Sequence, residues 1–301
     1  MRFQTIMTPR CVLVAGATGR LGREIVRELK GRGYCVRALG RSPARLETLR
    51  DVADELCVAE ALDPATLPAA MENVDQIVSC LGASVIPLPQ YGRRAFTRLD
   101  YPANRNLIEA AVTAQVGKFV YVSLFGAERL RHMDFVRGHE QVVEFLRASG
   151  LDYAVVRPTG FFSSMEEIVL VASWGLLPES RGGTARTNPI HEADLAAFCA
   201  DVLADASGRR EYDVGGPEAL TRQQIAQLAY MAIGKDADYR RVPVGVLRGA
   251  GTLLRPFNPR VAHLMTFIAE VLAEDFVAPA YGTRTLTDYF ARRRGGLQDK
   301  V

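Results

Sequence analysis

The sequence has little cysteine and no long apolar segment. Its 301 residues include five cysteines, which lie far apart and form no CxxC or CxxH pair: Cys11, Cys35, Cys57, Cys80 and Cys199. This spacing argues against a zinc site or a disulfide framework and is typical of buried thiols in a reducing compartment. No apolar run approaches the roughly 18 residues of a membrane span, and residues 1–10 contain no apolar signal-peptide core. We therefore expect a cytoplasmic protein without a membrane span.

Charge of one sign is also lacking. Lys and Arg total 37 while Asp and Glu total 34, so the formal net charge is only +3, and both signs are interleaved along the chain. Such a pattern does not predict nucleic-acid binding. The four histidines are dispersed without HxxxH or HExxH spacing, which argues against a metal site. With 48% hydrophobic and 24% charged residues, the composition is that of an ordinary globular protein.

Strand-like apolar runs and amphipathic helical segments alternate over the first half of the chain. The pattern predicts strands at 11–15, 34–39, 55–59, 76–81, 118–123 and 152–157, and helices at 20–31, 43–50, 64–71, 98–115 and 135–149. Parallel strands need a crossover connection, and helices between strands supply one. The sequence therefore predicts an α/β fold, a Rossmann-type doubly wound parallel sheet, with a dinucleotide-binding domain over residues 1–158.

The regular alternation stops after Pro158. The remaining pattern predicts helices at 163–173, 192–204, 221–233, 244–254 and 260–274, and short strands within 184–189 and 211–214. We expect residues 159–301 to form a smaller, mainly helical C-terminal substrate lobe, with some segments returning to the first domain. The segment 243–277 is basic and amphipathic. We interpret it as the wall of a substrate pocket; the alternatives are a helix that lies on a membrane or docks on a partner.

The strongest motif is a glycine-rich turn, GATGRLG at residues 16–22, which follows the first strand and opens the first helix. Gly16 permits a tight turn, Gly19 allows the backbone to approach a pyrophosphate, and Gly22 allows the helix to pack closely on the sheet. The phosphates would then bind free N–H groups at the positive helix end. The alternative is a purely structural turn. In this strand–turn–helix context we expect a nucleotide contacted by Gly16, Thr18, Gly19, Arg20, Leu21 and Gly22.

The end of the second strand indicates which nucleotide binds. An NAD site usually has an acidic residue there for the ribose hydroxyls, but residues 37–42 read RALGRS and contain no acid. Arg41 is positioned to pair with a 2′-phosphate through a bidentate fork, and Arg20 could assist from the glycine turn. We therefore expect NADP(H) to be preferred over NAD(H). The alternative is that these arginines are ordinary surface charges.

At this point the chain resembles the atypical short-chain dehydrogenases/reductases of the NmrA-like group, which includes NAD(P)H-binding reductases and cofactor sensors. The glycines are spaced three and three, as in that superfamily. Further matching segments are VRALGRS at 36–42, FVYVS at 119–123, SGLDYAVVRP at 149–158, PIHEADL at 189–195 and DVGGPEALT at 213–221. The resemblance implies that Glu60, Ala61 and Leu62 form the turn on the adenine side, with Glu60 where Asp is usual.

The chain departs from this family at the catalytic pair. Members with standard chemistry carry Tyr-x-x-x-Lys on the fifth helix, and the matching positions here are Phe135 and His139. Phenylalanine cannot donate a proton, so the standard carbonyl-reduction mechanism does not carry over. The resemblance leaves Ser123, at the end of the fifth strand, to hydrogen-bond a substrate oxygen. His139 could act as a general acid with a pKa near neutrality, or could bond a ribose hydroxyl. A capping role for Ser123 and a structural role for His139 are the alternatives.

Residues that follow the fourth and sixth strands complete the expected site. Cys80, Leu81 and Gly82 end one strand, and Pro158, Thr159 and Phe161 follow the other. In this family both segments approach the nicotinamide end of the cofactor. Core packing at the strand ends is the alternative for all six residues.

Three functions remain open from the sequence. The first is an NADPH-dependent oxidoreductase that reduces a small, apolar carbonyl, quinone or enone without the Tyr/Lys pair. The second is a sensor or assembly factor that binds NADP(H) without turning it over. This function is considered because Phe135 replaces the tyrosine. The third is an isomerase or epimerase that retains its cofactor. The expected partners are a small apolar substrate and either a protein partner or a second copy of the chain, with no nucleic acid.

Overall fold

The main sheet contains seven parallel strands in the order β3-β2-β1-β4-β5-β6-β9. The computed structural model describes residues 10–82, 100–166, 176–179, 181–208, 210–232, 234 and 240–292. The strands of this sheet are β1 (Cys11–Ala15), β2 (Cys35–Gly40), β3 (Glu55–Val58), β4 (Gln76–Ser79), β5 (Lys118–Val122), β6 (Tyr153–Pro158) and β9 (Glu211–Val214). Because all seven run in the same direction, their carboxyl ends share one edge of the sheet.

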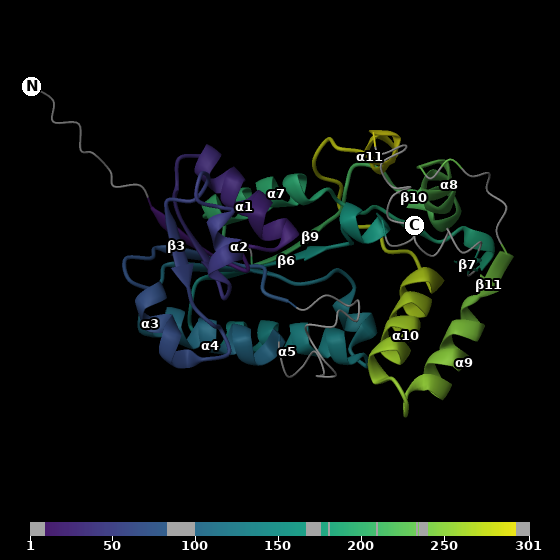
Figure 1. Ribbon diagram of the computed structural model, residues 1–301, viewed down its shortest axis with the longest axis horizontal. Coiled ribbons are helices and arrows are strands. Elements are labelled where there is room, and N and C mark those ends of the chain that lie inside the picture. Colours follow the sequence, from purple (N-terminus) through teal and green to yellow (C-terminus); the bar gives the residue numbers. More distant parts are fainter. Residues whose placement is uncertain are drawn as a thin grey trace, which may run out of the picture.

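Helices cover both faces of the sheet (Figure 1). One face carries α1 (Arg20–Gly31), α2 (Pro43–Glu47) and α7 (Glu192–Ala204), and the other carries α3 (Leu67–Ala70), α4 (Asp100–Thr113) and α5 (Asp134–Ala148). Strand β1 shows why both faces are covered, since Val12 and Val14 enter one core while Leu13 and Ala15 enter the other. The Rossmann-type fold expected from the sequence is therefore confirmed.

The C-terminal part adds small sheets and helices beyond the main sheet. Strand β7 (Leu176–Glu179) pairs in parallel with β11 (Arg240–Pro243), and β8 (Arg186–Thr187) pairs antiparallel with β10 (Leu220–Thr221). The helices are α8 (Arg222–Ala232), α9 (Val244–Leu254), α10 (Pro259–Ala273) and α11 (Leu286–Arg292), and short 3-10 turns lie at Pro64–Thr66, Ala127–Leu130 and Arg181–Gly183. In the part of the chain described, no helix is both long and apolar enough to cross a membrane.

The sequence predicts most elements to within two residues. The first six strands and the helices at 192–204, 244–254 and 260–274 are all present, and the strand expected within 211–214 adds to the main sheet as β9. The helix expected at 43–50 ends earlier, at Glu47. Strands β7 and β11 and helix α11 were not predicted. Of the helix expected at 163–173, residues 167–173 lie outside the described residues.

A buried ion-pair network fixes α5 to the sheet. On β6, the Arg157 guanidinium lies 2.7 Å from Glu140 of α5 and 3.3 Å from Glu211 of β9. Arg131 lies 3.0 Å from the other oxygen of Glu140. Arg157 and Glu140 are both buried, so neither charge is solvated by bulk water. Loss of one partner would leave the other charge buried without full compensation.

We expect Glu140→Ala to lower the free energy of unfolding by about 3 kcal/mol, because Arg157 would remain buried with a single, longer contact to Glu211. Chemical denaturation at neutral pH measures this loss. Glu144→Ala is the matched control: Glu144 lies one turn further along the same helix, is exposed, and pairs only with Arg131 at 3.4 Å, so its loss should stay below about 1 kcal/mol. Equal losses in the two variants would contradict the buried-pair account.

Candidate functional site

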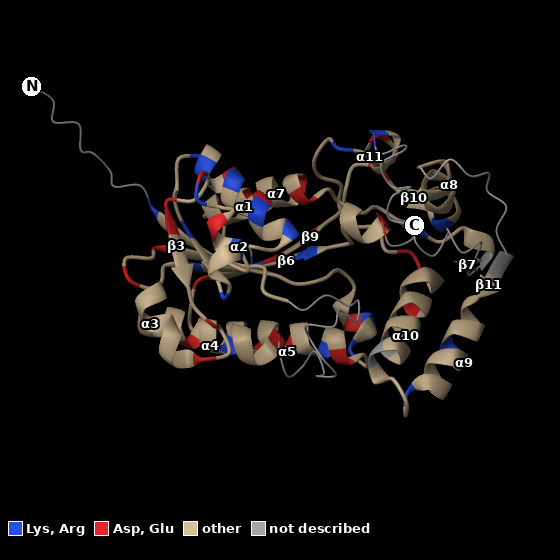
Figure 2. Cartoon of the chain, viewed as in Figure 1, with Lys and Arg blue, Asp and Glu red and all other residues tan. Residues whose placement is uncertain are grey.

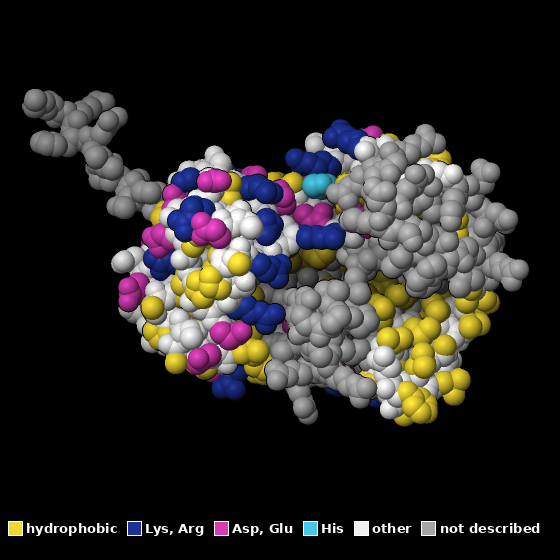
Figure 3. Space-filling model, viewed as in Figure 1, with side chains coloured by type: hydrophobic (Ala, Val, Ile, Leu, Met, Phe, Trp, Pro, Cys, Tyr) yellow, Lys and Arg dark blue, Asp and Glu magenta, His cyan; other side chains and the backbone are white. Residues whose placement is uncertain are grey.

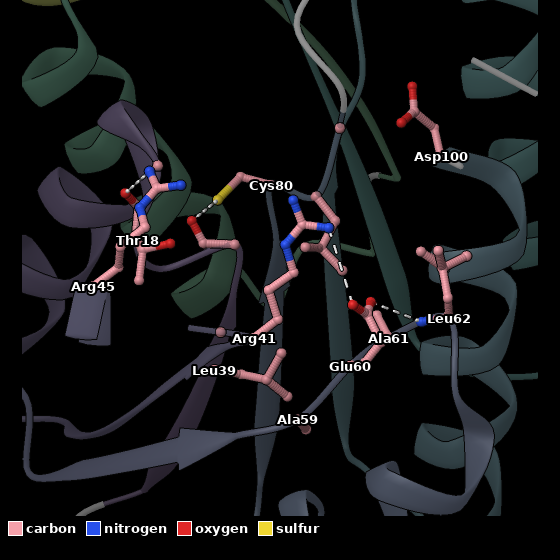
Figure 4. Close-up of a pocket in the computed structure, with 16 residues that line it drawn as sticks. Thr18, Leu39, Arg41, Arg45, Ala59, Glu60, Ala61, Leu62, Cys80 and Asp100 are labelled. Atoms are coloured by element: carbon pink, nitrogen blue, oxygen red, sulfur yellow. Dashed lines mark hydrogen bonds and ion pairs between the residues drawn. The ribbon is translucent and has the colours of Figure 1, made fainter. Parts of the chain in front are cut away.

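A crevice lies where the carboxyl ends of β1, β2, β3 and β4 meet (Figure 4). Its lining residues come from the glycine turn, from the segments after these strands, and from the start of α4: Gly16, Thr18, Gly19, Leu39, Gly40, Arg41, Arg45, Ala59, Glu60, Ala61, Leu62, Cys80, Leu81, Gly82, Asp100 and Ala103. Ten of these were expected from the sequence as cofactor contacts. The structure thus brings together residues separated by as many as 87 positions, from Gly16 to Ala103.

The glycine turn holds α1 against the end of β1. Gly16 has a φ of +83°, a left-handed conformation that favours glycine. A Cβ on Gly22 would lie 2.2 Å from the carbonyl oxygen of Gly16, so only glycine permits this approach. The expected purposes of these two glycines, a tight turn and close helix packing, agree with this geometry. Leu21 points away from the crevice into the core beside α1.

The N-terminus of α1 is left open for an anion. No side chain caps it at Gly19, and its first turn contains no acidic residue. The positive end of the helix dipole and its N–H groups therefore face the crevice without a negative partner from their own turn. Such an arrangement suits a pyrophosphate.

Two arginines reach the crevice, and only one of them was expected. The guanidinium of Arg41 lies 4.0 Å from Glu60, and Arg45, in α2, donates a hydrogen bond to the carbonyl oxygen of Thr18 at 3.2 Å (Figure 4). Arg20 does not line this crevice. Its side chain is exposed, lies 3.7 Å from Glu166, and borders a second pocket between α1 and the C-terminal part. Arg45, and not Arg20, therefore accompanies Arg41.

Helix α4 fixes the backbone on two sides of the crevice. Asn106 donates a hydrogen bond to the carbonyl oxygen of Ala61 at 3.0 Å, and Asn104 donates to that of Leu81 at 3.1 Å. Glu60 accepts a bond from the N–H of Leu62 at 3.3 Å, which closes the turn after β3. These amide side chains were not singled out in the sequence, because their partners lie more than 20 residues away.

The fourth strand ends beside the glycine turn at Cys80. Its Sγ lies 3.2 Å from the carbonyl oxygen of Ala15, and burial raises the pKa of the thiol to about 12. Cys80 is therefore a neutral thiol at physiological pH and serves as packing at the floor of the crevice. All five cysteines are free, and the described residues contain no cluster of three or more metal-ligating side chains.

The residues after β5 and β6 lie outside the crevice lining. Ser123 is buried, and its Oγ has no hydrogen-bond partner among the described residues. Thr159 donates a hydrogen bond to the carbonyl oxygen of Asn188 at 2.6 Å, Pro158 ends β6, and Phe161 packs against the core beside α1. Thr159, Pro158 and Phe161 therefore have structural partners of their own, whereas the Ser123 hydroxyl has none within the described part of the chain.

His139 is held by a buried tyrosine on the neighbouring strand. The hydroxyl of Tyr121 lies 2.7 Å from His139 Nδ1. Burial raises the pKa of Tyr121 well above its usual value of 10, and burial lowers the pKa of His139 from 6.5 to about 4. Both groups are therefore neutral at physiological pH. The near-neutral pKa expected for His139 from the sequence is wrong, because the ring is enclosed between α5 and the sheet.

The hydrogen bond with Tyr121 selects one tautomer of His139. The tyrosine hydroxyl has no other hydrogen-bond partner among the described residues, so it donates its proton to Nδ1, and the ring proton resides on Nε2. A Cβ placed on Gly82 would lie 3.9 Å from Nε2 and 3.7 Å from Cε1. His139 therefore presents a neutral N–H donor toward the end of β4.

Phe135 occupies the position one helical turn before His139. Its ring packs at 4.8 Å from the His139 ring and at 5.7 Å from the ring of Phe267 on α10, both edge to face. The place of the family's tyrosine is thus filled by an aromatic contact to the C-terminal part. Position 135 therefore carries no hydroxyl, in agreement with the departure noted in the sequence.

The crevice fits a dinucleotide by its own chemistry. Its glycines allow a backbone approach that a Cβ would prevent, and the end of α1 favours a diphosphate. Arg41 provides positive charge near Glu60, and Arg45 provides it near Thr18. The unpartnered Ser123 Oγ and the Nε2 donor of His139 lie after and beside the neighbouring strand β5. The end of α1 thus offers donors inside the crevice, whereas Ser123 and His139 lie outside its lining.

Comparisons with known proteins agree with this geometry. Residues 16–206 match the model of a family described as NAD(P)H-binding. The chain is 27% identical to divinyl chlorophyllide a 8-vinyl-reductase of Arabidopsis thaliana, over 93% of this chain and 76% of the relative. It is 29% identical to the photosystem II assembly factor Ycf39 of Synechocystis, over 82% of this chain and 75% of the relative.

Solved structures show the same fold at lower identity. The NADPH-dependent quinone oxidoreductase QOR2 of Escherichia coli, complexed with NADPH, superposes with a TM-score of 0.72 at 22% identity. The superposition covers 93% of this chain and 99% of the oxidoreductase. This likeness confirms the NAD(P)-binding type of fold that the sequence resemblance implied.

The depressed pKa of His139 predicts a pH dependence of stability. The unfolded chain binds a proton at this histidine near pH 6.5, and the folded chain only near pH 4, so the unfolded state gains protons first as pH falls. We expect the free energy of unfolding to be about 2 kcal/mol lower at pH 5 than at pH 7 from this group alone. Denaturation of the wild type and of His139→Gln at both pH values measures it. A wild-type pH dependence that persists in full in His139→Gln would contradict the assignment.

Proposed function

This chain belongs to the NAD(P)H-binding family, and on that premise we propose that it is an NADPH-dependent oxidoreductase of the atypical short-chain type. Its substrate is a small, largely apolar carbonyl, quinone or enone, reduced without the usual Tyr/Lys pair. The observation that carries the proposal is a crevice suited to a nucleotide with two polar groups beyond it. These are the Ser123 hydroxyl, directly after β5, and His139 Nε2, on α5 beside Gly82.

The preference for NADP(H) rests on the charge after β2. Arg41 follows this strand directly, Arg45 reaches the same crevice from α2, and no acidic residue occupies the end of the strand. Two guanidinium groups suit a 2′-phosphate, whereas an NAD site would place a carboxylate at this position. Glu60, 4.0 Å from Arg41, lies on the adenine side of the crevice and orients Arg41 in the free protein.

The nicotinamide, when bound, supplies a hydride to the substrate. The residues of the chain bind and orient the cofactor and the substrate. The N-terminus of α1 receives the diphosphate, and His139 Nε2 donates to a ribose hydroxyl at the far end. The Ser123 hydroxyl, which lacks a partner among the described residues, donates to the substrate oxygen. Burial keeps His139 neutral, so it positions a ligand as a hydrogen-bond donor and does not deliver a proton as imidazolium.

The relatives support an unsaturated or quinone-like substrate. The names of the similar proteins specify a vinyl reductase and a quinone oxidoreductase. Products of such reductions can take their proton from solvent, which suits a site with Phe135 where the family has tyrosine. We propose that the segment 159–301 supplies the apolar wall of the substrate pocket and that the protein acts in the cytoplasm, a reducing compartment in keeping with five free cysteines.

A second candidate function is an NADP(H)-binding assembly factor or sensor without turnover. Phe135 favours it, because its ring fills the place of the proton donor and packs against Phe267 of the C-terminal part. Through this contact between Phe135 and Phe267, a nucleotide bound beside α5 would alter the surface formed by α10. The similarity to a protein named as a photosystem II assembly factor supports this candidate.

The cofactor preference is tested at the two arginines. We expect Arg41→Ala and Arg45→Ala each to weaken NADP(H) binding by about 1–3 kcal/mol, since each removes a charge-assisted hydrogen bond to the 2′-phosphate. Titration of NADP(H) and NAD(H) side by side measures the change, and NAD(H) affinity should stay near the wild-type value. The matched control is Arg50→Ala, because Arg50 is exposed and pairs with Glu47 on the protein surface. An unchanged NADP/NAD ratio in both variants would remove the assignment.

Turnover separates the two candidate functions. We expect NADPH oxidation with at least one quinone, enone or apolar carbonyl, and a loss of kcat/KM of about tenfold or more in Ser123→Ala, from one lost hydrogen bond to the substrate. Ser207→Ala serves as control, because Ser207 precedes β9 and so lies at the opposite edge of the sheet. Stoichiometric NADPH binding without oxidation by any compound of a broad panel would favour the assembly factor instead.

A further inference from the structure

Helices α9 and α10 form a hairpin at the edge of the molecule, away from the main sheet (Figure 1). The two helices pack closely at Gly251, where a Cβ would lie 2.9 Å from Thr266 Oγ1 and 3.0 Å from the carbonyl oxygen of Ala262. The Gly251 side of α9 is therefore covered by α10. The opposite side of α9, and the turn that joins the helices at residues 255–258, face outward.

Large apolar side chains are exposed on this outward side. Val246 is 57% exposed, Leu253 75% and Phe257 76%. Val246 and Leu253 are seven residues apart and so lie on one face of α9, while Phe257 sits in the turn. Figure 3 shows hydrophobic side chains gathered in this region of the molecule, at the lower right. We call Val246, Leu253 and Phe257, with Arg255 between the last two, the hairpin tip. A cluster of this kind marks an interaction site.

The charge around the hairpin tip has one sign. Residues 239–269 contain no Asp or Glu and five arginines: Arg240, Arg241, Arg248, Arg255 and Arg260. Figure 2 shows blue and no red along α9. Arg248 pairs at 3.2 Å with Glu270, which lies near the far end of α10. Arg255 is exposed close to Phe257 and forms no ion pair with any acidic residue that the structure describes.

We propose that the hairpin tip binds the surface of an anionic lipid bilayer. Phe257 and Leu253 would enter the interface between headgroups and acyl chains, and Arg255 and its neighbours would contact the anionic headgroups. A helix with an apolar exposed face, flanked by arginines and free of acids, has the chemistry of an interfacial anchor. This role is independent of the nucleotide crevice, which lies at the edge of the main sheet.

The charge also argues against a second copy of the chain as the occupant. A symmetric contact places the same patch on both subunits, so the arginines of two hairpin tips would face one another without an acid between them. An anionic surface removes this repulsion. The shape agrees, because the turn between α9 and α10 projects at the edge of the molecule (Figure 1), and Phe257 in this turn and Leu253 beside it are exposed.

The test uses the full chain with phosphatidylcholine vesicles, prepared with and without phosphatidylglycerol. We expect the protein to sediment with the anionic vesicles only, and to bind them more weakly as the salt concentration rises. Phe257→Asp should lower the partition coefficient on the order of tenfold, because a carboxylate would replace the aromatic ring that enters the bilayer interface. Arg255→Gln should lower the partition coefficient about fivefold, which is the contribution of one arginine to binding at an anionic membrane surface.

Val58→Asp is the matched control, since Val58 is 56% exposed on β3 in the main sheet. It should bind vesicles as the wild type does, and every variant should keep the wild-type thermal shift with NADP(H), which shows that it is folded. Equal binding to neutral vesicles, no binding at all, or equal loss in Val58→Asp would overturn the proposal. So would a wild-type dimer that Phe257→Asp dissociates while vesicle binding is absent, because a second copy would then cover the hairpin tip.

Discussion

The close contact between the glycine turn and the first turn of α1 is the constraint on which the site depends. Only the absence of a side chain on Gly22 lets the helix approach the carbonyl oxygen of Gly16, and the left-handed conformation of Gly16 turns the chain back toward the helix. The axis of α1 is thereby fixed with its positive end over the edge where the strands finish. The segments after β2, β3 and β4 then complete the crevice, because parallel strands end at the same edge.

The crevice and the neighbouring His139 are held in place by different contacts. On one side, amide side chains of α4 hold the backbones of Ala61 and Leu81. On the other side, a buried hydroxyl fixes the His139 ring, and the ion pair between Arg157 and Glu140 fixes the helix that carries it. Both arrangements place their donors before a ligand arrives. A ligand that meets fixed donors avoids part of the ordering cost of binding.

The sequence predicted what depends on local pattern. The strand, turn and helix around Gly16 follow from neighbouring residues, and so does the position of Arg41 after β2. Contacts over long sequence distances were not predictable. Nothing near Arg45 shows that it reaches Thr18, and nothing near Arg20 shows that Glu166 draws it toward the C-terminal part. The pKa of His139 also could not be foreseen, because it depends on burial between α5 and β5 and not on the residues beside it.

The neutrality of His139 bears on the chemistry that the site can support. In the family members with standard chemistry, a lysine at this position carries a positive charge and lowers the pKa of the catalytic tyrosine, whereas His139 is neutral and Phe135 has no hydroxyl. A simple ketone concentrates that charge on one oxygen as it is reduced, and a single hydroxyl such as that of Ser123 offsets it poorly. A quinone or enone spreads the charge over a conjugated system and depends less on a cation. Under the proposed function, the loss of both the proton donor and the cation would favour conjugated acceptors over simple ketones; under the second candidate it would leave binding alone.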